Sequence, residues 1–257
     1  MSEAAELRLL GVVRVERDGE PVRGFRSRKA LAVLCYLAVQ RHPIPREQLV
    51  DMFWGDQPES RGRANLSWVL SHISTHLPDC LATDRHTVRF RRSSACRVDI
   101  DAFEELASQG DPASQAAAVE LFGGEFLEGL HLDGCPEFEI WAVGERERWR
   151  QRFEHALESL IGHHRGLGEY ERGLEFARRL LALEPWREET HRQMMLLLAR
   201  SGQRGAALAQ YEICCHVLAE ELVVEPAEAT TTLYERIRDG VDLGLVSSQT
   251  PHNLPLS

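Results

Sequence analysis

The sequence lacks any long apolar segment. Its longest uninterrupted apolar run, Ala30–Val39, has ten residues, whereas a helix needs roughly 20 to cross a bilayer. The acidic N-terminus, Met1–Glu6, has no apolar stretch of the kind that a secretory signal requires. We therefore expect a folded cytoplasmic protein that does not bind membranes.

The short motifs of common catalytic sites are also missing. The chain contains no Gly-x-x-x-x-Gly-Lys-Ser/Thr, no Gly-x-Gly-x-x-Gly, no Gly-x-Ser-x-Gly and no His-Glu-x-x-His. Its 11 histidines show no metal-ligand spacing. We expect no catalytic residues, no metal and no cofactor, so an enzyme is the least favoured class of function.

Cysteine is sparse and unpatterned. None of the six cysteines forms a Cys-x-x-Cys pair. In a reducing compartment such residues are expected to be small, buried and reduced. They are Cys35, Cys80, Cys96, Cys135, Cys214 and Cys215.

Basic charge is scarce overall but unevenly distributed. The net charge is -10, and Lys29 is the single lysine among 30 basic residues. Residues 1–93 carry 15 basic against 11 acidic side chains, whereas residues 94–257 carry 15 against 29. This asymmetry is expected when only the first part of a chain meets a polyanion.

The first part, residues 1–95, is predicted to be a small α+β domain. Leu7–Val15 is rich in strand-forming residues, Asp18-Gly19 is a turn signal and Pro21–Phe25 is a short partner strand. The next segment, Lys29–Val39, has the apolar spacing of a helix, and Ser27 is a plausible N-cap.

Two further helices follow. Pro45 is well placed in the first turn of a helix over Arg46–Trp54. The third helix is predicted over Ser60–Leu77, where five apolar side chains fall within about 100° of arc. These core residues are Leu66, Val69, Leu70, Ile73 and Leu77.

A basic hairpin completes the first domain. Leu81–Asp84 and Thr87–Arg91 are predicted strands around Arg85-His86. Three helices followed by a hairpin form a winged helix-turn-helix, whose third helix enters the major groove and whose wing contacts the backbone. The candidate DNA-binding residues are Arg61, Arg63, Ala64, Trp68, Ser71, His72 and Thr75 on the third helix, Arg85, Arg89 and Arg91 on the wing, and Arg28, Lys29 and Arg46 at the starts of the first two helices. Alternatively, this is an α+β domain with a solvated basic hairpin, and Trp68 contacts the second domain.

The second domain, residues 96–243, is predicted to be all helical. Gly168-Glu169-Tyr170-x-x-Gly173-Leu174 matches Gly202-Gln203-Arg204-x-x-Ala207-Leu208 at an offset of 34 residues, the period of tetratricopeptide (TPR) repeats. Such a domain contacts peptides or proteins, or alternatively serves as a spacer or a dimerisation unit. Residues 244–257 are predicted to be a linker.

At several positions the chain resembles the SARP-type bacterial regulators, in which an OmpR-type winged helix is joined to a bacterial transcriptional activator domain (BTAD). The matching residues are Arg28-Lys29-Ala30-Leu31, Leu49, Phe53-Trp54 and Ala64-Asn65-Leu66 in the first domain, and Gly124-Glu125-Phe126-Leu127, Pro136-Glu137-Phe138-Glu139-x-Trp141, Glu145-Arg146-Glu147, Ala182-Leu183-Glu184-Pro185 and Glu220-Glu221-Leu222-x-x-Glu225-Pro226 in the second.

This resemblance implies a mainly α protein, in which an N-terminal α+β winged helix-turn-helix is followed by an all-α TPR-like domain. It also implies sequence-specific binding to double-stranded promoter DNA, a homodimer on direct repeats, and recruitment of RNA polymerase subunits. Residues 251–255 resemble the junction at which larger members continue into a nucleotide-binding ATPase module. The chain is therefore expected to be either a short member or the N-terminal part of a longer one.

The third helix departs from the family pattern. Members usually end this helix with several arginines, whereas Leu70–Leu77 contains none and carries His72 and His76 instead. Histidine is mostly neutral at pH 7, so DNA affinity is expected to be weak or to depend on the wing and on Arg61 and Arg63. The competing hypothesis is therefore a protein-interaction module whose winged helix has weak or no DNA binding.

Overall fold

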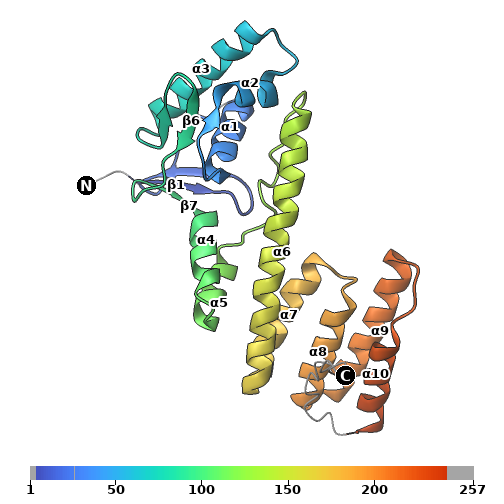
Figure 1. Ribbon diagram of the computed structural model, residues 1–257. Helices are drawn as coiled ribbons and strands as arrows, with labels where there is room; N and C mark the ends of the chain where they lie inside the picture. The colour runs from blue at the N-terminus through green and yellow to red at the C-terminus, as the bar shows by residue number, and fades with distance from the viewer. Residues whose placement is uncertain (1–3, 26, 242–257) are drawn as a thin grey trace, which may run out of the picture. The chain divides into compact units, whose positions relative to one another are not determined.

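The computed structural model describes residues 4–25 and 27–241, which divide into two compact units at Ala156/Leu157. Helices predominate, and the strands all belong to the first unit within this described part of the chain (Figure 1). The predicted mainly α fold, with an α+β region preceding helical repeats, is confirmed. The predicted domain boundary at residues 95/96 lies inside the first unit and stays a prediction.

The N-terminal sheet has the strand order β3-β2-β1-β7. Asp18 and Gly19, both at positive φ, form the predicted tight turn between β2 and β3. The predicted strand over Leu7–Val15 is wrong in its extent, because the chain leaves the sheet after Arg8 and re-enters it at Arg14. The strands are β1 (Ala5–Arg8), β2 (Arg14–Arg17), β3 (Glu20–Pro21) and β7 (Cys96–Val98).

The three predicted helices are present almost as expected, as α1 (Arg28–Val39), α2 (Arg46–Trp54) and α3 (Glu59–His76). The Ser27 side chain accepts a hydrogen bond from the Ala30 amide and caps α1. All five apolar residues predicted for the core stripe of the third helix are buried. A second sheet, in the order β4-β6-β5, contains the predicted hairpin. Its strands are β4 (Ile44–Pro45), β5 (Leu81–Thr83) and β6 (Thr87–Phe90).

The expectation that all six cysteines are unpaired is wrong. Cys80, just before β5, forms a disulfide with Cys96, the first residue of β7. Their Cα atoms lie 5.6 Å apart, within the range that a disulfide spans. The pairing was missed because β7, which aligns Cys96 with Ala5 of β1, is too short to be recognised from a sequence pattern.

The first unit also contains a helical segment that packs on α1 and α2. It comprises α4 (Asp99–Ser108), α5 (Pro112–Glu120) and the start of α6 (Pro136–Leu167). Tyr36 of α1 lies 4.9 Å from Trp141 between ring centroids, and Phe53 of α2 lies 5.4 Å from Phe138. These aromatic contacts make the winged helix and this helical segment share one core.

The second unit is a stack of antiparallel helices built as predicted from the 34-residue repeat. Gly168 and Gly202, at φ +75° and +81°, form the turns that join the helices within each repeat. The buried His191 accepts a hydrogen bond at Nδ1 from Gln210 and donates from Nε2 to the Pro185 carbonyl, so its neutral form is held in place. The helices after α6 are α7 (Tyr170–Leu183), α8 (Glu188–Arg200), α9 (Arg204–Glu221) and α10 (Glu228–Asp239).

The predicted linker, residues 244–257, lies outside the described residues. Within 4–25 and 27–241, no helix has the combination of length and apolar character needed to cross a membrane.

A buried carboxylate connects the N-terminal sheet to α4. Asp99 Oδ2 accepts hydrogen bonds from the amides of Leu9 (2.8 Å) and Leu10 (2.9 Å), and Oδ1 accepts one from Ile100. Burial raises the pKa of Asp99 from 3.8 to about 6, and these hydrogen bonds oppose the rise. The folded chain therefore holds a proton on Asp99 at pH values where the unfolded chain has released it.

This raised pKa predicts a specific pH dependence of stability. Protonation of Asp99 stabilises the folded state fully below the unfolded pKa, and that contribution is lost as pH rises through about 6. We expect the unfolding free energy of the wild type, measured relative to Asp99→Asn, to fall by about 2 kcal/mol between pH 4 and pH 6.5. Urea denaturation of both proteins at several pH values measures this difference. A difference that stays constant with pH would contradict the assignment.

Candidate nucleic-acid interface

The outer face of α3 is formed by small, polar and aromatic side chains. At 100° per residue, Arg61, Ala64, Trp68, Ser71 and Thr75 fall within about 100° of arc opposite the core stripe. All five are exposed. The Thr75 hydroxyl donates to the Ser71 carbonyl at 2.9 Å, which keeps it along the helix. This narrow face presents a bulky ring between small residues.

A glycine allows α3 to approach α2 closely. Gly62 is buried in the first turns of α3. A Cβ added there would lie 2.7 Å from Val50 Cγ1 and 3.4 Å from Trp54 Cβ. Glycine normally weakens a helix, but here the absence of a side chain permits the contact that orients α3 on α2.

The two histidines of α3 are engaged within the protein. His72, half-buried, stacks on Trp68 with ring centroids 5.1 Å apart and donates from Nε2 to the Gly24 carbonyl at 3.2 Å. His76 lies against the same glycine, where a Cβ would fall 1.9 Å from its Nε2. Phe25 contacts both imidazole rings. The histidines therefore connect α3 to the segment before α1, and His72 packs against one face of the Trp68 ring.

The wing is an alternating hairpin with an ordered turn. Val88 and Phe90 are buried, whereas Arg89 and Arg91 are exposed on the opposite face. Asp84 accepts hydrogen bonds from the amides of His86 and Thr87 and from the Thr87 hydroxyl. The bonds to Thr87 and His86 lower the pKa of Asp84 to about 2. The turn is thus held by an ionised carboxylate at neutral pH.

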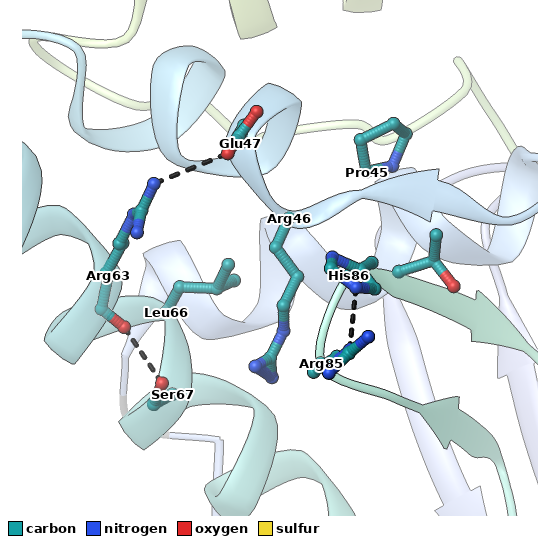
Figure 2. Close-up of a pocket in the computed structure, with 9 residues that line it drawn as sticks. Pro45, Arg46, Glu47, Arg63, Leu66, Ser67, Arg85 and His86 are labelled. Carbon is teal, nitrogen blue, oxygen red and sulfur yellow. Dashed lines mark hydrogen bonds and ion pairs between the residues drawn. The ribbon is translucent and has the colours of Figure 1, made fainter.

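A cationic pocket lies between the start of α2, the middle of α3 and the wing turn (Figure 2). Its volume is about 620 Å³. Arg46 extends into it, and its Nε atom is buried without a hydrogen-bond partner. Arg85 donates to His86 Nε2 at 2.7 Å. The pocket is lined by Pro45, Arg46, Glu47, Arg63, Leu66, Ser67, Arg85, His86 and Thr87.

Carboxylates offset part of this positive charge. Arg63 lies 2.5 Å from Glu59 and 3.3 Å from Glu47, and all three side chains are largely exposed. The pocket nevertheless contains three arginines and one glutamate. An anion would therefore be attracted to it, and the unsatisfied Nε of Arg46 would gain a hydrogen-bond acceptor.

Three other basic residues contact the protein away from the pocket. Lys29 donates to the Phe53 carbonyl at 2.7 Å, at the C-terminal end of α2, whereas the pocket lies at the N-terminal end. Arg28 donates to the Gly129 carbonyl. Arg92, which follows the wing, pairs with Asp101 and donates to the Gln40 carbonyl at the end of α1. The sequence shows that these three residues are positively charged. It does not show that they bond to groups of the protein, whereas Arg89 and Arg91 of the wing are exposed.

Arg46, Arg63 and Arg85 are all predicted DNA-binding residues, but the sequence does not show that they line one pocket. The other residues that line the pocket are not among the predicted site residues. Two of these residues have a local signal. Ser67 lies one helical turn after Arg63 and donates to its carbonyl at 2.9 Å, and Glu47 directly follows Arg46 in the chain. His86 and Thr87 come from a different element. The pocket depends on the Arg46 amide bonding to the His86 carbonyl at 2.8 Å, which no local pattern predicts.

Comparison with known proteins agrees with this architecture. Residues 98–238 match the model of the bacterial transcriptional activator domain. The regulatory protein AfsR of Streptomyces coelicolor is 28% identical over 249 residues, covering 92% of this chain, which spans only 24% of the length of AfsR. The regulatory protein DnrI of Streptomyces peucetius is 25% identical over 239 residues, covering 86% of this chain and 88% of DnrI.

A solved structure shares the fold. Mycobacterium tuberculosis EmbR, determined in complex with a low affinity phosphopeptide, superposes with a TM-score of 0.71 at 22% identity, covering 94% of this chain and 66% of EmbR. The fold and these relatives define a SARP-type transcriptional regulator. Within that class, the chain belongs to the bacterial transcriptional activator domain family.

The close contact at Gly62 predicts a destabilising substitution that a second change relieves. Gly62→Ala places a methyl group against Val50 and is expected to lower the unfolding free energy by about 1–3 kcal/mol, despite the higher helix propensity of alanine. In Gly62→Ala/Val50→Ala the clash is removed. Urea denaturation of the two single variants and the double variant should therefore show a positive coupling between the sites. Additive effects would mean that Gly62 does not set the distance between α2 and α3.

Proposed function

We propose that this regulator is a sequence-specific DNA-binding transcription activator. The observation that supports it best is the cationic pocket, where α2, α3 and the wing each contribute an arginine and the buried Arg46 Nε has no hydrogen-bond partner. A phosphate of the DNA backbone would supply negative charge and hydrogen-bond acceptors to the arginines of all three elements. Because the pocket joins α3 to the wing, a phosphate held there would orient both on the duplex.

The exposed face of α3 is suited to base contacts. A major groove about 12 Å wide accepts a helix, and Ala64, Ser71 and Thr75 are small enough for the backbone to approach base edges closely. Trp68, 59% exposed and supported by His72, would make apolar contact with a thymine methyl group. His72 then contributes by positioning this ring rather than by contacting phosphate.

Phosphate charge would come from a limited set of arginines. Arg89 and Arg91 are exposed on the wing, and Arg61 is exposed on α3. Arg63 is partly neutralised by Glu47 and Glu59. Arg28 and Lys29 bond to backbone carbonyls and would act by positioning α1 and α2. With so few phosphate contacts, we infer a modest affinity and a correspondingly shallow fall of affinity with salt.

The remaining assignments rest on the family resemblance. We infer that residues 1–95 bind DNA and that residues 96–243 make protein contacts, with RNA polymerase subunits as partners and a homodimer on direct repeats. A cytoplasmic, non-enzymatic protein fits this role. AfsR is about four times longer than the matched region.

A second candidate function is a protein-interaction module with weak or no DNA binding. Two observations favour it: residues 70–76 at the end of α3 contain no arginine, and two glutamates pair with Arg63. In that case the cationic pocket would hold an acidic side chain of a protein partner. DNA titrations against salt distinguish the two functions.

The wing predicts a sequence-independent contribution to affinity. Replacing Arg89 and Arg91 with alanine should weaken binding to every promoter fragment about equally and reduce the slope of log K against log salt by roughly one unit per lost phosphate contact. Fluorescence anisotropy at several salt concentrations measures both quantities. Arg97→Ala, which removes an exposed arginine from β7 in the other sheet, is the control and should leave both unchanged. Equal effects in all variants would mean that only net charge matters.

Trp68 predicts a contribution to sequence preference instead. Trp68→Ala should reduce affinity for the cognate promoter by about 1–3 kcal/mol while changing affinity for random DNA much less. The control is Trp186→Ala, which removes another partly exposed tryptophan, from the loop before α8. A ratio of specific to random affinity that Trp68→Ala leaves unchanged would contradict base contact by this ring.

A further inference from the structure

The second unit has an apolar surface at one end of its helical stack. The α7–α8 and α9–α10 connections lie at the same end of the four antiparallel helices (Figure 1). Five exposed apolar side chains, four in these connections and one at the last residue of α7, are here called the end patch. They are Leu183, Trp186, Leu222, Val223 and Val224.

Hydrogen bonds hold the two connections together. Glu188, the first residue of α8, accepts at Oε1 from the Ala227 amide at 2.7 Å and from the Thr230 hydroxyl. Arg192 donates to the same Thr230 hydroxyl at 2.8 Å. These bonds join the start of α8 to the start of α10, so the end patch belongs to one ordered surface.

Val223 occupies a strained conformation within this patch. Its φ is +57°, a region that β-branched residues avoid because of steric clashes. Its side chain is 85% exposed, so no internal packing compensates for the strain. The positive φ follows the end of α9 and lets the Val224 amide donate to the Leu218 carbonyl at 3.3 Å, an arrangement in which glycine is the usual residue. Valine at this position keeps an exposed apolar side chain in the patch.

The rim of the end patch is strongly acidic. Segments 182–189 and 219–229 contain seven glutamates and one arginine. That arginine, Arg187, is already paired with Glu184 and Glu158. Glu221, Glu225 and Glu228 are exposed, and within the described part of the chain no ion pair involves them. An apolar centre with an acidic rim is complementary to a segment that carries both apolar and basic side chains.

We propose that the end patch binds a basic amphipathic helix of a protein partner, with Val223 and Trp186 contacting its apolar face and Glu221, Glu225 and Glu228 pairing with its basic residues. This surface is separate from the winged helix in sequence and does not depend on DNA binding. Helix recognition of this kind combines apolar anchors with charge complementarity at the rim.

The test uses the full chain and a fluorescent probe peptide of about 18 residues, with leucine along one helical face and lysine along the other. The wild type should bind it, more weakly at high salt, and should not bind the same peptide with glutamate in place of lysine. Val223→Asn should weaken binding at least tenfold without lowering the melting temperature, because asparagine tolerates a positive φ. The matched control is Ile213→Asn on α9, which removes an exposed β-branched side chain outside the patch.

The charged rim is tested separately. Glu221→Gln/Glu225→Gln should weaken binding and reduce its salt dependence, whereas Glu175→Gln/Glu212→Gln, which neutralises two exposed glutamates of α7 and α9, should change it little. Equal effects of patch and control variants, or equal binding of the acidic peptide, would overturn the proposal. So would a change of oligomeric state in Val223→Asn measured by light scattering, since the occupant would then be a second copy of the chain.

Discussion

The first unit depends on the burial of Phe53 at the end of α2. Its ring lies within 6.0 Å of Tyr36 and 5.4 Å of Phe138 between centroids. Its carbonyl oxygen, which has no partner within α2, accepts hydrogen bonds from Lys29 Nζ and Cys135 Sγ. One residue thus connects α1, α2 and the segment that leads into α6. Because α3 packs on α2 at Gly62, the orientation of the outer face of α3 follows from this shared core.

The elements predicted correctly from sequence are those whose periodicity is local. The helices over residues 28–39, 46–54 and 59–76 follow from apolar spacing, and the 34-residue repeat follows from Gly168 and Gly202. The strand β7 has three residues and pairs in parallel with a strand some 90 positions earlier. No local pattern encodes such a pairing, and the Cys80–Cys96 disulfide was missed with it.

For the candidate site, sequence indicated which residues carry charge but not where the charge is used. Arg92 belongs to the same basic run as Arg89 and Arg91, yet it caps α1 through the Gln40 carbonyl and pairs with Asp101. In the hairpin, exposed residues such as Arg89 and Arg91 alternate with buried ones. The local signal that sets Arg92 apart is that it lies one residue beyond this pattern. Lys29 likewise serves the C-terminal end of a neighbouring helix, where a cation is favourable. Such roles require tertiary structure because the partner carbonyls are distant in sequence.

The distribution of charge is compatible with the two binding surfaces proposed for this acidic chain. DNA would repel the glutamate-rich helices of the second unit, so in the proposed function contact with a polyanion is confined to the arginines of α2, α3 and the wing. The same glutamates surround the end patch and would attract a basic protein segment. At physiological salt, charge effects extend only about 8 Å from exposed groups, so each proposed surface would select its partner by the charges in its immediate surroundings. Because the positive charge of the winged helix is modest, the proposed sequence preference would depend on shape and apolar contact, with the Trp68 ring, 59% exposed, as the apolar side chain that makes it.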